Sequence, residues 1–275
     1  MTTDQDKGPL LGRQVPIATS YAPELLHPVP RAASRAALNL AGTALPFTGE
    51  DVWHAYELSW LDAAGRPRVF IGRIRVPADS PNLIESKSLK LYLNSLNEER
   101  FSSDAEATDR IARDLGRVAE AAVTVDLLLL DDISFAGHMP DGQCIDDAQV
   151  SAPEGRPDRA LLRAEAGGSA SESLYSNLLR SLCPVTGQPD WATLCITYSG
   201  QALDRASLLR YIIAFRAHQD FHEHCVERIF CDLLAVCRPS ELSVQALYTR
   251  RGGLDICPWR TTTGALAPVR RMNRQ

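Results

Sequence analysis

The sequence predicts an α+β protein built from two tandem modules, each with an antiparallel sheet and helices packed on one face of it. Segments that alternate with a period of two are interleaved with segments of helical period, and both halves repeat the order strand, strand, helix, helix, strand. A length of 275 residues suits two modest domains. A composition of 45% hydrophobic and 23% charged residues excludes a disordered or fibrous chain.

Two strands and a hairpin turn are predicted to open the first half, after an irregular, proline-containing lead-in of about thirty residues. Apolar and polar side chains alternate over 53–60 and again over 69–76, which is typical of strands with one buried face. The residues from Asp62 to Pro67 supply the turn between them.

Two helices and a third strand are predicted to follow. Leucines three or four residues apart over 89–96 indicate the first helix, which the segment ESKSLK enters. Ser103 and Glu106 match a capping box and mark the start of the second helix. The run VTVDLLLL at 123–130 then predicts the strand.

The second half repeats this order after a stretch rich in Asp, Gly and Pro at 131–158, where we place the boundary between a module at 1–150 and a module at 151–275. The repeated order suggests a tandem duplication, although the residues themselves show no repeat. The expected strands are 173–182, 192–198 and 242–248, and the expected helices are 203–216 and 219–236.

Composition also limits where the protein works and what it binds. The first ten residues contain no apolar core of a signal peptide, and no apolar run reaches the roughly 20 residues of a membrane helix, so we expect a cytoplasmic protein with no membrane contact. Seven cysteines form an odd set and are expected to be free thiols. A net charge of -5 argues against direct nucleic-acid binding.

Cys183 is the candidate nucleophile because it begins CPVTGQPD, where two prolines and a glycine enforce a turn. A cysteine on a turn is expected to be partly exposed, as thiolate chemistry requires, and Asp190 could act across the turn as the proton donor. The alternative is a structural turn with Asp190 as a cap. Four other cysteines lie in periodic apolar segments and are expected to be buried: Cys195, Cys225, Cys231 and Cys237.

Three further motifs are ambiguous by themselves. Zinc ligands on one helix must be three or four residues apart, and in DFHEHCVERI only His222 and Cys225 meet this spacing. Neither an H-E-x-x-H nor a C-x-x-C motif is present, so no metal site is predicted there. Glu85 in ESKSLK could be a helix cap, and Arg251 before Gly252 could hold a phosphate or end a strand. No strand is followed by a G-x-G-x-x-G fingerprint, so a Rossmann dinucleotide site is not supported.

The chain strongly resembles the NADPH-dependent 7-cyano-7-deazaguanine reductases, the nitrile reductases of queuosine biosynthesis, in their long two-domain form. The resemblance covers nearly the whole chain beyond the lead-in, and CPVTGQPD with ESKSLK is far more specific than a short generic motif. It is carried by ESKSLKLYLNS at 85–95, CPVTGQPDW at 183–191, YIIAFRAHQDFHEHCVERIF at 211–230 and YTRRGGLDICPWR at 248–260.

The resemblance implies two fused tunnelling-fold modules, related to GTP cyclohydrolase I, in a chain that forms homodimers. It implies that Cys183 adds to the nitrile carbon of 7-cyano-7-deazaguanine as a covalent thioimide, and that Asp190 donates the proton. Two molecules of NADPH then reduce the adduct to the primary amine. The resemblance assigns substrate contacts to Ile84, Glu85, Ser86, His222 and Glu223, and NADPH contacts to Ser86, Lys87, Arg251 and Gly252.

One departure from the family and three rival functions accompany this interpretation. Cys257 stands before PWR, where the family usually has asparagine, and would add an oxidation-sensitive thiol if it were exposed. A cysteine nitrile hydrolase would release ammonia, and a zinc-dependent cyclohydrolase of the same fold would bind zinc. The third rival is a catalytically silent purine-binding or tRNA-binding module.

Overall fold

The computed structural model describes residues 20–40, 42, 44–151, 153, 155–264, 268 and 271–275, and its described part is mixed α+β with mainly antiparallel strands. The part of the predicted lead-in before Ser20 lies outside these residues, and the prediction is wrong for the part from Ser20 to Pro30, which contains a short 3-10 helix at 23–25 and a paired strand at 28–30. The chain forms two compact units, and each contains separated segments. Unit 1 comprises the described residues up to Arg31, Trp53–Asp132 and Arg251–Leu254, and unit 2 comprises Ala32–Val52, Ile133–Arg250 and Asp255–Gln275.

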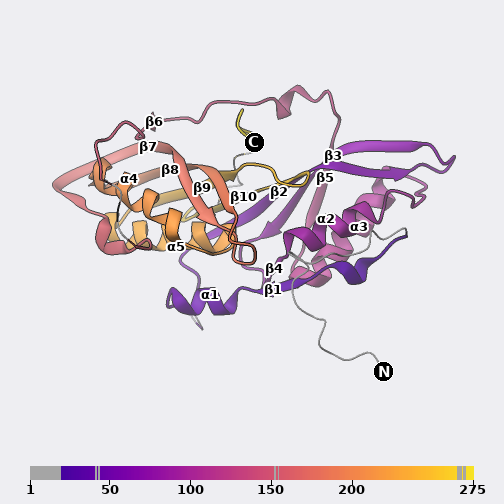
Figure 1. Cartoon of the computed structure of the whole chain (residues 1–275), viewed down its shortest axis with the longest axis horizontal. Helices are drawn as coiled ribbons and strands as arrows, with labels where there is room; N and C mark the ends of the chain where they lie inside the picture. The colour runs from indigo at the N-terminus through magenta and orange to yellow at the C-terminus, as the bar shows by residue number, and fades with distance from the viewer. Residues whose placement is uncertain are drawn as a thin grey trace. The chain divides into compact units, whose positions relative to one another are not determined.

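Unit 1 contains the strands and helices expected of the first half, drawn in indigo to magenta in Figure 1. Its larger sheet has the order β5-β3-β2, and β1 pairs with β4 in a second, two-stranded sheet. Strand β2 begins in unit 2 and continues in unit 1. The elements are η1 (Pro23–Leu25), β1 (Pro28–Pro30), β2 (Thr48–Leu61), β3 (Pro67–Pro77), β4 (Asn82–Ile84), α2 (Ser86–Asn94), α3 (Asp104–Ala119) and β5 (Thr124–Leu128).

The predicted local signals of unit 1 are confirmed in most details. Asp62 closes the hairpin turn, where its backbone N–H donates to the Arg66 carbonyl at 2.9 Å. Ser103 caps α3 by accepting the Glu106 N–H at 3.2 Å. The Glu106 carboxylate, however, accepts the N–H of Ser102 and not that of the cap residue, so the capping box is shifted by one residue.

Unit 2 also contains the order strand, strand, helix, helix, strand, flanked by further elements, and its sheet runs β10-β9-β8-β7-β6. Each unit thus contains three strands that are neighbours in chain order within its sheet: β2-β3-β5 and β7-β8-β9. The elements are α1 (Ala32–Ala37), η2 (Ile133–Phe135), β6 (Gln143–Cys144), η3 (Arg159–Leu161), β7 (Ala164–Leu182), β8 (Pro189–Leu203), α4 (Arg205–Ala214), η4 (Phe215–Ala217), α5 (His222–Cys237), β9 (Glu241–Tyr248) and β10 (Leu254–Thr261).

Helix α5 packs on β7, β8 and β9, and α4 packs on β7, so both lie along one face of these strands (Figure 1). One side of α5 is apolar and buried, with Cys225, Ile229 and Leu233 fully enclosed. Successive residues of a strand point to opposite faces of a sheet. A separate buried cluster of unit 2 includes Leu247, Cys257 and Trp259. This packing fixes the first turn of α5 against the carboxyl end of β7, where the candidate nucleophile lies.

Strand β10 and helix α1 were not predicted from the sequence. Every residue of β10 is buried, so the strand lacks the alternation that marks a half-buried strand, and Pro258 lies inside it. All seven cysteines are free, as expected. None of the helices among the described residues is both long and apolar enough to cross a membrane.

Candidate active site

Cys183 lies at the end of β7, on the tight turn that leads into β8. The turn is closed by hydrogen bonds from Cys183 N–H to the Gln188 carbonyl at 2.8 Å and from Gly187 N–H to the Cys183 carbonyl at 3.0 Å. Gly187 has a φ of 67°, a conformation that glycine adopts without strain. The proline and glycine residues of CPVTGQPD therefore build the turn that the sequence predicts.

The expected exposure of Cys183 is wrong, because the residue is only 6% exposed. The backbone of its own turn folds over the sulfur, and the Thr186 N–H donates to Sγ at 3.5 Å. The turn thus orients the thiol and shields it from bulk water. Other thiols are unsuited to nucleophilic chemistry, since burial raises the pKa of Cys195 and Cys231 to about 12.

Asp190 lies across the hairpin from the nucleophile, as predicted. It pairs with Ser181 in the β7–β8 register, and Ser181 lies two residues before Cys183. The Asp190 carboxylate is buried, and its Oδ2 lies 3.2 Å from Nε2 of His222. The structure therefore brings a carboxyl group and an imidazole together at the end of the hairpin that carries Cys183.

His222 is the first residue of α5 and is held by a ring contact that the sequence did not reveal. Its imidazole stacks on the Tyr248 ring with centroids 3.7 Å apart and an interplanar angle of 8°. Tyr248 ends β9 and is fully buried. Glu223, the next residue of α5, is also buried. Two residues that the family resemblance assigns to the substrate thus begin one helix in unit 2.

The ESKSLK motif lies in unit 1, where Glu85 is the N-cap of α2. Its carboxylate accepts the N–H of Lys87 at 3.0 Å and the N–H of Ser88 at 2.8 Å, so the capping alternative is correct for this residue. A carboxylate has about four acceptor positions, so these two bonds leave capacity for a ligand. Ile84 precedes the cap in the buried strand β4, and Ser86 and Lys87 are half-buried.

The turn at 251–254 meets α2 within unit 1. Gly252 has a φ of 61°, and a Cβ at this position would lie 3.3 Å from Nζ of Lys90. Lys90 also pairs with Glu57 at 3.7 Å. The predicted cofactor residues therefore come from segments that pack against each other, although they are far apart in the sequence. Lys90 was missed, although its spacing of three residues from Lys87 in ESKSLK is a helical signal.

The predicted site residues thus fall into two groups. Cys183, Asp190, His222 and Glu223 lie in unit 2, whereas Ile84, Glu85, Ser86, Lys87, Arg251 and Gly252 lie in unit 1. Cys257 lies outside both groups. It is buried in unit 2, where the Gln275 side chain donates to its sulfur at 3.0 Å, so the exposure that would make it oxidation-sensitive is not present.

Comparisons with known proteins agree on one family. The model described as "Nitrile reductase, 7-cyano-7-deazaguanine-reductase N-term" matches residues 17–127, and the model described as "QueF-like protein" matches residues 189–265. Similar curated proteins are each named NADPH-dependent 7-cyano-7-deazaguanine reductase. One from Chromohalobacter salexigens is 52% identical over 94% of this chain and 93% of its own length. One from Saccharophagus degradans is 50% identical over 96% and 98%.

Proposed function

The chain belongs to the family of NADPH-dependent 7-cyano-7-deazaguanine reductases, and from this premise we propose that it reduces the nitrile of 7-cyano-7-deazaguanine to the primary amine, a step of tRNA queuosine biosynthesis. The observation that carries the proposal is the Asp190–His222 pair, 3.2 Å apart, at the hairpin that carries Cys183. A thiol nucleophile beside an acid–base pair is the arrangement that covalent chemistry on a nitrile requires.

In the proposed mechanism, the Cys183 thiolate attacks the nitrile carbon and forms a C–S bond as the C≡N bond becomes C=N. The nitrile nitrogen becomes strongly basic during this attack and must receive a proton. Asp190 is the proposed donor, and the imidazole of His222 is close enough to pass a proton to it or to stabilise the carboxylate that remains. The product of this step is a thioimide on Cys183.

Substrate recognition is assigned to buried carboxylates. The guanine-like edge presents adjacent N–H donors, and a carboxylate accepts such a pair in charge-assisted hydrogen bonds. Glu223 suits this role because it follows His222 on the first turn of α5 and is buried there. We separately propose that Glu85, together with Ile84 and Ser86, contacts the substrate. This assignment rests on the family resemblance and on the remaining acceptor capacity of the Glu85 carboxylate.

The residues of unit 1 fit a phosphorylated cofactor. Lys87, Lys90 and Arg251 supply positive charge, and Gly252 places no side chain of its own beside the Lys90 ammonium. We propose that these groups and the Ser86 hydroxyl hold the phosphates of NADPH. When bound, NADPH supplies the hydride for each of two reductions that together convert the nitrile to the amine.

The function is tested by mixing the protein with 7-cyano-7-deazaguanine and following NADPH absorbance. We expect two molecules of NADPH to be oxidised for each molecule of substrate, with no ammonia released. Release of ammonia without NADPH oxidation would instead identify a nitrile hydrolase. Activity that depends on stoichiometric zinc would favour the cyclohydrolase alternative.

Replacing Arg251 by glutamine is expected to raise the KM for NADPH about tenfold, because a charge-assisted hydrogen bond to phosphate contributes about 1.5 kcal/mol or more. The KM for 7-cyano-7-deazaguanine should change much less. Steady-state kinetics at saturating nitrile measure both values. Arg66→Gln, at the exposed hairpin turn of unit 1, is the matched control and should leave both constants unchanged. An unchanged KM for NADPH in Arg251→Gln would remove this residue from the cofactor site.

We base the proposed domain organisation and oligomeric state on the family and on the order of the strands and helices within each unit. The common order of three neighbouring strands, with two α-helices between the second and third strand of each set, supports two tandem tunnelling-fold modules. We further propose that the chain is a homodimer and binds no nucleic acid directly. Seven free cysteines support a cytoplasmic location. Light scattering of the purified protein would test the dimer, and a filter-binding assay with tRNA would test the absence of RNA binding.

A further inference from the structure

The segment that precedes α5 is hydrogen-bonded to the residues that lead into the nucleophile. Leu182 N–H donates to the His218 carbonyl at 2.9 Å, and Asp220 N–H donates to the Leu182 carbonyl at 3.1 Å. The Gln219 side chain donates to the Cys183 carbonyl at 3.0 Å. A displacement of residues 218–220 would therefore be transmitted directly to the turn that carries the thiol.

The side chain of Asp220 forms hydrogen bonds with the first turn of α5. The N-cap residue Phe221 makes no capping bond with its side chain. Instead, Asp220 Oδ1 accepts the Phe221 N–H at 2.8 Å and lies 3.0 Å from Nδ1 of His224. A negative charge here is also favourable at the amino end of a helix. The Asp220 carboxylate therefore contacts both the N-cap residue of α5 and a side chain of its first turn.

The charge state of the pair is defined by its surroundings. Burial alone would raise the pKa of Asp220, but the nearby imidazoles of His218 and His224, at 3.5 and 3.0 Å, outweigh burial and hold the pKa below its usual value. An ionised Asp220 accepts a hydrogen bond from His224 in the tautomer that carries its proton on Nδ1. His224 is 2% exposed and contacts the Phe221 ring, which restricts its imidazole to this orientation.

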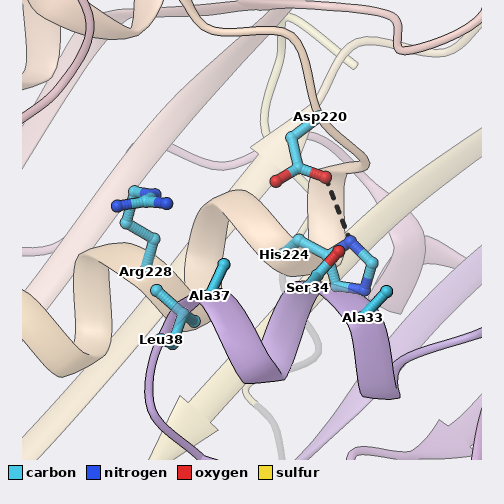
Figure 2. A pocket seen from close by; sticks show the side chains of 7 residues that line it. All are labelled: Ala33, Ser34, Ala37, Leu38, Asp220, His224 and Arg228. Carbon is cyan, nitrogen blue, oxygen red and sulfur yellow. Dashed lines mark hydrogen bonds and ion pairs between the residues drawn. The ribbon is translucent and has the colours of Figure 1, made fainter.

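Asp220 and His224 border a hollow and not a close-packed core. They line a pocket of about 280 Å³ with Arg228 and with small residues of α1 (Figure 2). Truncating Asp220 would enlarge a space that already exists, so the expected loss of stability is that of a helix cap and its hydrogen bonds, about 1–2 kcal/mol, without the cost of a new sealed cavity. Effects of this substitution on chemistry can thus be separated from effects on folding.

We propose that Asp220 is a positioning residue, which through its bond to His224 holds the first turn of α5, and with it His222 and Glu223, in register with Cys183. The inference rests on the proposed nitrile chemistry, because it concerns how the nucleophile and the Asp190–His222 pair are aligned. A misplacement of about 1 Å among reacting groups can lower a rate about 10²-fold.

The test measures thioimide formation in the absence of NADPH, as the rate at which intact protein gains the mass of 7-cyano-7-deazaguanine at saturating substrate. We expect Asp220→Ala to slow this rate about 10²-fold, with a melting temperature lower by only roughly 5 °C, the loss that a missing helix cap causes. Asp220→Asn keeps an acceptor oxygen and should recover most of the rate. His224→Leu should be slow, and the double variant should be no slower than Asp220→Ala, because both changes remove one contact.

Asp232→Ala is the matched control, since it removes another carboxylate of α5, one that accepts the Tyr211 hydroxyl at 2.7 Å further along the helix. Its adduct should form at the normal rate. A normal rate in Asp220→Ala, or a melting temperature and rate that fall equally in Asp232→Ala, would overturn the positioning role. Failure of the unchanged protein to form any adduct would refute the proposed function first, and this inference with it.

Discussion

Replacing Cys183 by alanine is expected to abolish covalent capture of the substrate and to lower nitrile reduction on the order of 10⁴-fold or more. Loss of an enzyme nucleophile removes the whole covalent pathway and leaves only the acceleration that binding and positioning provide. The structure supports a specific requirement for this thiol, because its turn orients the sulfur toward the Thr186 N–H and its hairpin carries Asp190.

Two measurements check this expectation. Coupled NADPH oxidation gives the loss of turnover, and intact mass without NADPH shows whether one substrate is attached. Cys195→Ala is the matched control, because this thiol lies on the same hairpin and burial holds its pKa at about 12. The control should form the adduct at the normal rate. An adduct that persists in Cys183→Ala, or disappears in Cys195→Ala, would assign the chemistry to another residue.

Local sequence patterns predicted the elements whose cause is local. The alternation in β2 and β3 reflects one buried face, and the Ser103 cap is formed by residues within one turn of α3. Strand β10 gave no such signal, because it is buried on both faces and contains Pro258. The position of Asp190 across the turn from Cys183 was also predictable, because a tight hairpin fixes its own register.

Contacts between distant segments could not be predicted in this way. The stacking of His222 on Tyr248 depends on how α5 lies on β9, and the backbone hydrogen bonds between residues 218–220 and Leu182 depend on how the segment before α5 joins β7. Neither contact has a spacing rule that links it to the nucleophile. The exposure of Cys183 was misjudged for a related reason: turn residues predict a bend, but not the backbone that folds back over the sulfur.

A second group of distant residues forms a buried charge network in unit 2 that no motif announced. Glu227 on α5 accepts Nη2 of Arg35 at 2.8 Å and Nη2 of Arg260 at 2.9 Å, and Arg260 also donates to Asp51 at 2.8 Å. The two guanidinium groups lie 5.9 and 5.5 Å from the Phe47 ring centroid. Two cations and two anions balance each other. Burial would lower the pKa of Arg260, but Asp51 and Glu227 raise it.

Replacing Glu227 by glutamine is therefore expected to destabilise unit 2 by roughly 3–5 kcal/mol, because it removes the carboxylate that pairs with both Arg35 and Arg260, which are buried. Glu227 and Arg260 are each 0% exposed, so water cannot solvate the excess charge. Differential scanning calorimetry should show a melting temperature lower by on the order of 10 °C. Arg205→Gln, which breaks the more exposed pair with Glu172, should cost about 1 kcal/mol or less. Equal shifts in the two variants would mean that burial of the network adds nothing to its strength.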